Sequence, residues 1–232
     1  MDGCNDIGIS RDLDFPRIRK LLSIGLFSSL LTFAADMILG WGTEDETLRG
    51  ISRMLSAYTD ISDGALFFCA LAGLIGISIE GLSFFGIYRM IVPYSEKYAH
   101  LYRTGIFGWM LFAPCGFHVP VCAAVFLQKH FGADDIIEKY AVFFVLPSII
   151  LFSIFFIVLS APQIRTFLEG YTPYPKWCWV FSLPVMMAAV MLPNVFGDRA
   201  WVNALTSAWI SLGGIWMFGG LLMMMKRAVK QQ

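Results

Sequence analysis

The chain has 232 residues, of which 57% are hydrophobic and 15% are charged, and its mean hydropathy is +0.67. Soluble domains normally carry about 25% charged residues, and the apolar residues here form long blocks, so the composition indicates a membrane protein rather than a soluble one. The formal net charge is zero, from 17 basic and 17 acidic residues, and nothing in this balance indicates a nucleic-acid partner.

The first twenty residues, "MDGCNDIGISRDLDFPRIRK", are polar and mixed in charge. A secretory signal peptide places its basic region and its apolar run closer to the N-terminus. We therefore expect residues 1–20 to form a cytoplasmic N-terminal segment, and the first apolar block to be a retained helix.

A membrane-spanning helix needs about 20 predominantly apolar residues. The sequence therefore predicts an all-α membrane protein in which residues 21–226 form a six-helix transmembrane domain, followed by a cytoplasmic tail at 227–232. The lipid bilayer is its expected partner, and the sequence does not predict an oligomeric state. The six predicted spans are about 21–40, 64–88, 104–127, 139–162, 177–196 and 201–225.

The distribution of lysine and arginine predicts the orientation, because these residues are enriched in cytoplasmic loops. With the N-terminus inside, the cytoplasmic side holds 12 of the 17 basic residues. This bias predicts that the N- and C-termini are both cytoplasmic, in a multi-pass protein of the plasma membrane. The five basic residues on the outer side are Arg49, Arg53, Lys129, Lys139 and Arg199.

The first outer loop carries the pattern of an amphipathic helix. Thr43 and Glu46 have the spacing of a capping box, in which each side chain satisfies a free backbone N–H group. The apolar residues that follow recur at helical spacing opposite a polar face. We expect a surface helix here, which is either an ordinary connector or a lid over a site. The apolar positions are Leu48, Ile51, Leu55 and Tyr58.

Three ionisable residues fall inside predicted spans: Asp36, Glu80 and His118. Inserting Arg, Lys or Asp at the centre of a spanning helix costs about 2.5–3.5 kcal/mol. An ionisable residue within a span therefore usually faces the bundle interior and is often functional. The rise of 1.5 Å per residue places Asp36 and His118 in the outer parts of their helices and Glu80 in the inner part. We expect that Asp36 and His118 can meet, and that Glu80 reaches neither.

Small and polar residues recur on one face of three predicted helices. Such stripes are typical of close helix packing in lipid, but they also suit the wall of a polar cavity. The first and sixth helices carry Asp36 and Asn203 at the same outer depth, which favours a cavity there. The stripes are Gly25, Ser29, Thr32, Asp36 and Gly40; Cys69, Gly73, Gly76, Glu80 and Ser83; and Asn203, Ser207, Ser211 and Gly214.

Prolines inside the spans, and a polar connection after the fifth span, mark the same half of the bundle. An interior proline removes a backbone hydrogen bond and bends the helix, which we expect at Pro114, Pro120, Pro147, Pro184 and Pro193. The candidate residues for ligand binding or proton handling in the outer half are Asp36, His118, Asn194, Asp198, Arg199 and Asn203, with Glu80 as an inner candidate.

Cys115, His118 and Cys122 share a helix face and superficially suggest a metal site. The two cysteines lie two turns apart, about 10.5 Å along the helix, whereas zinc bonds are only about 2.0–2.3 Å long. We therefore expect no metal site and no cofactor. The sequence also lacks HExxH, GxSxG and CxxC motifs, so no catalytic signature indicates an enzyme.

Three functions remain compatible with these patterns. The first is a protein that binds or transports a small or amphiphilic molecule in an outward-opening cavity, and the polar stripes and bent helices favour it. The second is an intramembrane enzyme that acts on a lipid-like substrate, with Asp36 and His118 as an acid–base pair. The third is a structural or regulatory membrane protein without a ligand.

Overall fold

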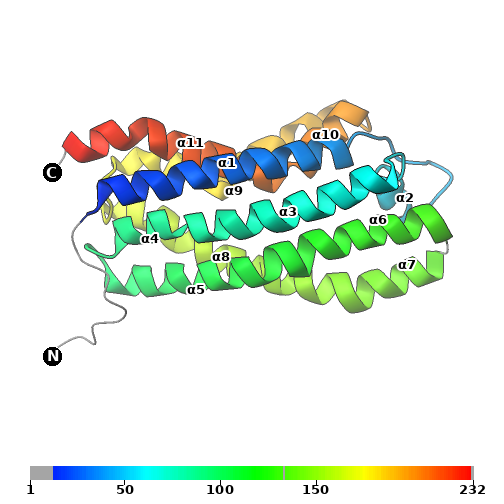
Figure 1. Ribbon diagram of the computed structural model, residues 1–232, viewed down its shortest axis with the longest axis horizontal. Helices are drawn as coiled ribbons and strands as arrows, with labels where there is room; N and C mark the ends of the chain where they lie inside the picture. The colour runs from blue at the N-terminus through cyan, green and yellow to red at the C-terminus, as the bar shows by residue number, and fades with distance from the viewer. Residues whose placement is uncertain (1–12, 133, 231–232) are drawn as a thin grey trace.

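The computed structural model describes residues 13–132 and 134–230, and all regular structure in those ranges is helical. Five helical stretches there are long and apolar enough to cross a membrane. They run along the long axis of the bundle (Figure 1), and they confirm the prediction of an all-α membrane protein. The five stretches are Phe15–Leu39, Asp63–Ile91, Glu96–Phe131, Asp135–Glu169 and Trp209–Lys230.

Several of these stretches consist of more than one helical segment. The first is the single helix α1 (Phe15–Leu39), and the last is α11 (Trp209–Lys230). The segments of the other three are α3 (Asp63–Ser83) and α4 (Phe85–Ile91); α5 (Glu96–Phe112), η2 (Ala113–His118) and α6 (Val119–Phe131); and α7 (Asp134–Tyr140), η3 (Ala141–Val145) and α8 (Leu146–Glu169).

The predicted span 177–196 is not a single helix. This segment consists of η4 (Lys176–Val180), α9 (Leu183–Val190) and η5 (Leu192–Phe196). The predicted helix 201–225 is also divided, into α10 (Ala200–Ser207) and α11, with Ala208 between them.

Prolines account for many of these divisions. Each of the five prolines predicted to bend a helix occupies one of the first two positions of a new segment: Pro114 in η2, Pro120 in α6, Pro147 in α8, Pro184 in α9 and Pro193 in η5. Proline lacks the N–H group that would continue a preceding helix, but it is tolerated in the first turn of the next one. The bends predicted from the sequence are therefore junctions between segments.

The predicted capping box in the first loop is wrong. The helix there, α2 (Gly50–Ser56), has seven residues and begins after Thr43 and Glu46. Gly50 has a φ of +59°, a left-handed conformation that interrupts helical geometry at that residue. Asp45 instead organises a local turn, because the backbone N–H and the hydroxyl of Thr47 both donate to its carboxylate. These hydrogen bonds hold the pKa of Asp45 below its usual value.

The glycines of the predicted small-residue stripes lie where α1 contacts α3, α10 and α11 and where α3 contacts η2, and several of them leave room for polar side chains. A methyl group added at Gly73 would collide with the imidazole of His118, and one at Gly76 would collide with the hydroxyl of Thr32. A methyl group at Gly214 would collide with Glu80. The stripes are therefore packing surfaces, as is usual in lipid, and their glycines leave the space that the buried polar groups occupy.

The described ends of the chain lie at the same end of the bundle (Figure 1). Phe15 and Arg19 of α1 share a surface pocket with Lys226 and Lys230 of α11. We call this the terminal end, and we call the opposite end, where α2 lies, the α2 end. Buried apolar residues form one cluster rich in aromatic rings, such as the stacked pair Phe84 and Phe218, and a smaller cluster at the α2 end.

Candidate functional site

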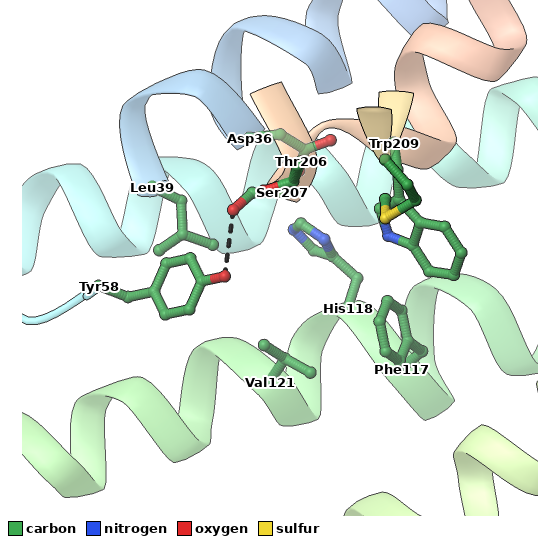
Figure 2. A pocket seen from close by; sticks show the side chains of 10 residues that line it. Asp36, Leu39, Tyr58, Phe117, His118, Val121, Thr206, Ser207 and Trp209 are labelled. Carbon is green, nitrogen blue, oxygen red and sulfur yellow. Dashed lines mark hydrogen bonds between the residues drawn. The ribbon is translucent and has the colours of Figure 1, made fainter. Parts of the chain in front are cut away.

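A cavity of about 310 Å³ lies where these two apolar clusters meet. Leu39 in its wall belongs to the smaller cluster, whereas Phe117 and Trp209 pack against the larger one. Figure 2 shows the lining side chains, with His118 in this view between the pair Tyr58–Ser207 and the rings of Phe117 and Trp209. The full lining is Asp36, Leu39, Tyr58, Phe117, His118, Val121, Met191, Thr206, Ser207 and Trp209.

Asp36 brings a carboxylate from α1 into the cavity wall. Its side chain is buried, with 7% of the residue exposed, and Ser211 of α11 donates a hydrogen bond to Oδ2 at 2.7 Å. Oδ1 has no hydrogen-bond partner among the residues that the structure describes. The lining contains no lysine or arginine, and its one basic side chain is the imidazole of His118, which forms no hydrogen bond with the carboxylate.

His118 brings an imidazole from the opposite wall, at the end of η2. Its Nε2 lies 3.1 Å from the carbonyl oxygen of Cys69 on α3. A carbonyl oxygen only accepts, so this contact assigns the hydrogen to Nε2 and leaves Nδ1 of the neutral ring as an acceptor. Nδ1 has no hydrogen-bond partner within residues 13–132 and 134–230. His118 thus offers the cavity a hydrogen-bond acceptor.

Asp36 and His118 share the cavity, but each is held by a different partner. Asp36 is bound by Ser211, and His118 by the backbone of Cys69. Within the described chain, no hydrogen bond joins the two side chains directly. A catalytic acid–base pair needs its groups within hydrogen-bond reach of each other or of one reacting group, and the first of these two arrangements is not formed here.

The cysteines around His118 lie on different sides of it. Cys122 is buried, with its sulfur 3.9 Å from Nε2 of His118, whereas Cys115 is exposed. Among the described residues, no group of three or more His, Cys, Asp or Glu side chains is arranged to hold a metal ion.

The sequence pattern did not predict that Tyr58 and Ser207 are partners. Ser207 is one turn from Ser211 along the predicted stripe, and its hydroxyl lies 3.1 Å from that of Tyr58. Tyr58 follows α2, and the sequence pattern assigned it only an apolar position on a surface helix. The hydroxyl of Tyr58 could have indicated a polar contact, because a buried tyrosine hydroxyl usually has a hydrogen-bond partner.

Asp198 and Asn203 lie outside the cavity lining and tie two loops together at the α2 end. Asn203 donates to the carbonyl oxygen of Gly42 at 2.8 Å and to Asp198 at 2.6 Å. Asp198 in turn accepts from the backbone N–H of Glu44 at 2.9 Å. We call these four residues the loop clamp. Glu44 also pairs with Arg53 at 2.8 Å, and this carboxylate raises the pKa of Arg53.

The remaining candidates are also outside the cavity. Asn194 and Arg199 are exposed, and Asn194 has only a contact of 3.8 Å with the sulfur of Met191. Glu80 is completely buried between α1, α3 and α11, where Ser29 donates to its Oε1 at 3.2 Å. Its Oε2 has no hydrogen-bond partner in the described part of the chain. The structure thus brings together Asp36 and His118 and leaves the other five candidates elsewhere.

Comparison with known proteins gives one match. Residues 5–228 match the model of a protein family that is described as a family of unknown function (DUF6796). No curated protein and no solved structure matches the chain. Because the match covers almost the entire sequence, the chain belongs to this family of unknown function, DUF6796.

Proposed function

We propose that this protein binds a small molecule in the cavity between Asp36 and His118 and transports it across the membrane. One observation carries the proposal: three interruptions of the helices converge on this cavity. Phe117 and His118 end the π-helical turn η2, Met191 separates α9 from η5, and Ser207 and Trp209 flank the break at Ala208.

Interrupted helices have a physical meaning in a membrane. Irregular backbone is tolerated at membrane depth only where protein buries it or where it lines a cavity. In many transporters, broken helices form the substrate site near the middle of the bilayer, and π-helical turns are frequent at functional sites. A structural protein whose polar groups only hold helices together has no need for three such breaks around one space.

The walls of the cavity also suit a small ligand. Its volume of about 310 Å³ lies at the lower end of the range of about 300–1,000 Å³ that is typical of ligand pockets. Most of the lining is apolar or aromatic, and a few polar atoms, from Asp36 and His118, are available to orient a ligand. This combination is typical of binding sites that select by shape and by a small number of hydrogen bonds.

We further propose that the chain crosses the plasma membrane six times, with both termini in the cytoplasm. Two contacts support a fifth crossing between α8 and α10. The hydroxyl of Tyr174 donates to the carbonyl of Leu221 in the C-terminal half of α11, whereas Asp198 bonds to the loop at the α2 end. The segments η4, α9 and η5 therefore connect the two ends of the bundle in three pieces.

The orientation follows from charge. The 12 basic residues assigned to one side of the membrane outnumber the five on the other, and those of the larger set that the structure describes lie with the terminal end. In this orientation the α2 end faces outward, and the cavity lies beneath the loop between Leu39 and Tyr58. We infer that the ligand enters from the outer side.

The test is to fill the cavity and to examine what the protein carries. We expect Val121→Trp to place an indole in the cavity, whereas Val142→Trp adds the same side chain at an exposed position of η3. Each variant and the wild type would be purified from native membranes in mild detergent, and the bound small molecules identified by mass spectrometry.

We expect a molecule that copurifies with the wild type and with Val142→Trp but not with Val121→Trp. Flux of that molecule into proteoliposomes would then show the same order. If the three proteins fold equally well by gel filtration and carry identical molecules, the proposed function is wrong.

A further inference from the structure

The polar atoms of the cavity indicate the charge of its ligand. We propose that the cavity takes an organic cation, namely an amine with an apolar body, and that the ammonium group pairs with Asp36. This inference rests on the proposed function, because it assumes that the cavity binds a ligand.

Two of the available polar atoms of the wall are acceptors, and one is a donor, the indole N–H of Trp209, which has no hydrogen-bond partner in the described chain. Oδ1 of Asp36 and Nδ1 of His118 both lack partners in the described chain, and both can accept a hydrogen bond. The hydroxyl of Ser207 is already engaged with Tyr58 and with the carbonyl of Asn203. The hydroxyl of Thr206 bonds to carbonyl oxygens of its own helix. A ligand that donates hydrogen bonds can therefore use both acceptors, whereas one that only accepts them is left with the indole N–H of Trp209.

The charge of the wall leads to the same conclusion. An ionised carboxylate that is buried without an opposite charge is unfavourable, and it becomes favourable only when it is paired and hydrogen-bonded. Asp36 has a single hydrogen bond from Ser211, and the lining has no lysine or arginine. An ammonium group supplies both a positive charge and N–H donors, whereas an anionic ligand would add a second negative charge.

The rest of the lining suits the apolar part of such an amine. Phe117, Trp209 and Tyr58 present aromatic rings, and Leu39 and Val121 add aliphatic surface. A cation near the face of an aromatic ring is attracted by the electron-rich face, and the attraction is stronger when water is excluded. The wall therefore recognises a cation by its aromatic rings as well as by its carboxylate.

The experiment uses three probes of one shape and different charge: phenylbutylamine, phenylbutanol and phenylbutyrate. Equilibrium binding of each probe to the purified full-length protein in detergent would be measured against protein-free micelles, which correct for partition into detergent. The variants are Asp36→Asn, which keeps an acceptor for Ser211 but removes the charge, and Asp36→Glu, which keeps the charge. Glu80→Gln is the matched control, because it removes a buried carboxylate outside the cavity.

We expect the wild type to bind the amine at least about tenfold more tightly than the alcohol or the carboxylate, because breaking a buried charge pair costs at least that factor. Asp36→Asn should abolish this preference, whereas Asp36→Glu and Glu80→Gln should retain it. Thermal unfolding of each variant would establish that it is folded.

Two results would overturn the inference in different ways. If the alcohol binds as tightly as the amine and Val121→Trp prevents the binding of both, the cavity binds ligands but does not select a cation. If no probe binds, or if Val121→Trp leaves the binding of all three unchanged, the cation inference and the proposed cavity both fail.

Discussion

His118 lies against Gly73 of α3, and its Nε2 lies within hydrogen-bond distance of the carbonyl of Cys69, one turn nearer the N-terminus of that helix. The absence of a side chain at Gly73 gives the imidazole its place, and the bond to Cys69 fixes which nitrogen faces the cavity. Gly73 thus determines where the imidazole of His118 lies, and the bond to Cys69 leaves its Nδ1 as the hydrogen-bond acceptor.

Gly73→Ala should therefore destabilise the protein. The added methyl group would collide with an imidazole that is buried and hydrogen-bonded, so His118 can move only by losing its bond to Cys69. Overpacking of this kind typically costs about 1–3 kcal/mol. We expect a lower midpoint of thermal unfolding in detergent, together with weaker binding of the amine probe.

Gly219→Ala is the matched control on α11. A methyl group there would have Leu26 as its nearest neighbour, at an ordinary contact distance of 3.8 Å. Because alanine favours a helix by about 1 kcal/mol over glycine, this variant should be as stable as the wild type or slightly more stable. Equal midpoints for Gly73→Ala and Gly219→Ala would contradict the role assigned to Gly73.

The site could be predicted only in part at this scale. It could be predicted that Asp36 and His118 meet, because the number of residues between each of them and the flanking charges predicts similar depths in the bilayer. Such a depth can be counted within each helix separately. The pairing of Tyr58 with Ser207 depends on how the first loop folds over α10. That contact joins residues 149 positions apart, and no local pattern encodes it.

At the scale of elements, the spans could be predicted from hydropathy, whereas the breaks between helical segments could not. Residues at these breaks line the cavity. Uninterrupted apolar length predicted the spans of α1, α3 and α5–α6, because hydropathy over about 20 residues is enough. Hydropathy alone could not predict the division of 177–196 into segments, because that stretch is mostly apolar, and Pro184 and Pro193 lie at the starts of new segments. The first loop was mispredicted for a similar reason, because Gly50 interrupts the amphipathic pattern.

The hydrogen bonds of the loop clamp hold the first loop, and none of its four residues lines the cavity. Removing these bonds should therefore make the first loop more mobile and leave the lining of the cavity unchanged. Asn203→Ala removes the hydrogen bonds to Gly42 and Asp198. Each such bond typically contributes about 1 kcal/mol, so the loss of both should cost about 2 kcal/mol, which corresponds to about 30-fold more open loop. We expect trypsin to cleave the purified protein after the exposed Arg49 about 30-fold faster.

Asn194→Ala is the control for this prediction. It removes the same side chain from an exposed position whose only hydrogen-bond partner among the described residues is the sulfur of Met191 at 3.8 Å. Cleavage after Arg49 should stay at the wild-type rate in this variant, since exposed substitutions usually change stability by less than about 0.5 kcal/mol. Equal rates for both alanine variants would show that Asn203 does not hold the loop.

At the scale of the whole molecule, the arrangement of the two ends leads to a topology that can be measured. The contact between Glu44 and Asp198 holds the loops before α2 and before α10 at one end. The pocket shared by Arg19 and Lys226 places the start of α1 and the end of α11 together at the other end of the bundle. Any membrane placement along the bundle axis must therefore keep the first pair of loops on one side of the bilayer.

Single cysteines labelled with a membrane-impermeant maleimide test this topology in intact cells. Two exposed positions belong to the α2 end: Thr47→Cys in the loop before α2, and Arg199→Cys next to Asp198 of the loop clamp. Two belong to the terminal end: Lys97→Cys in the first turn of α5, and Lys176→Cys at the start of η4, close to Tyr174. We expect the first two to react in intact cells and the second two only after permeabilisation, with the wild-type chain as the blank for its own cysteines. Reaction of Lys97→Cys and Lys176→Cys in intact cells would reverse the proposed orientation. Reaction of Thr47→Cys but not Arg199→Cys would place these loops on opposite sides, and it would exclude a crossing by η4, α9 and η5.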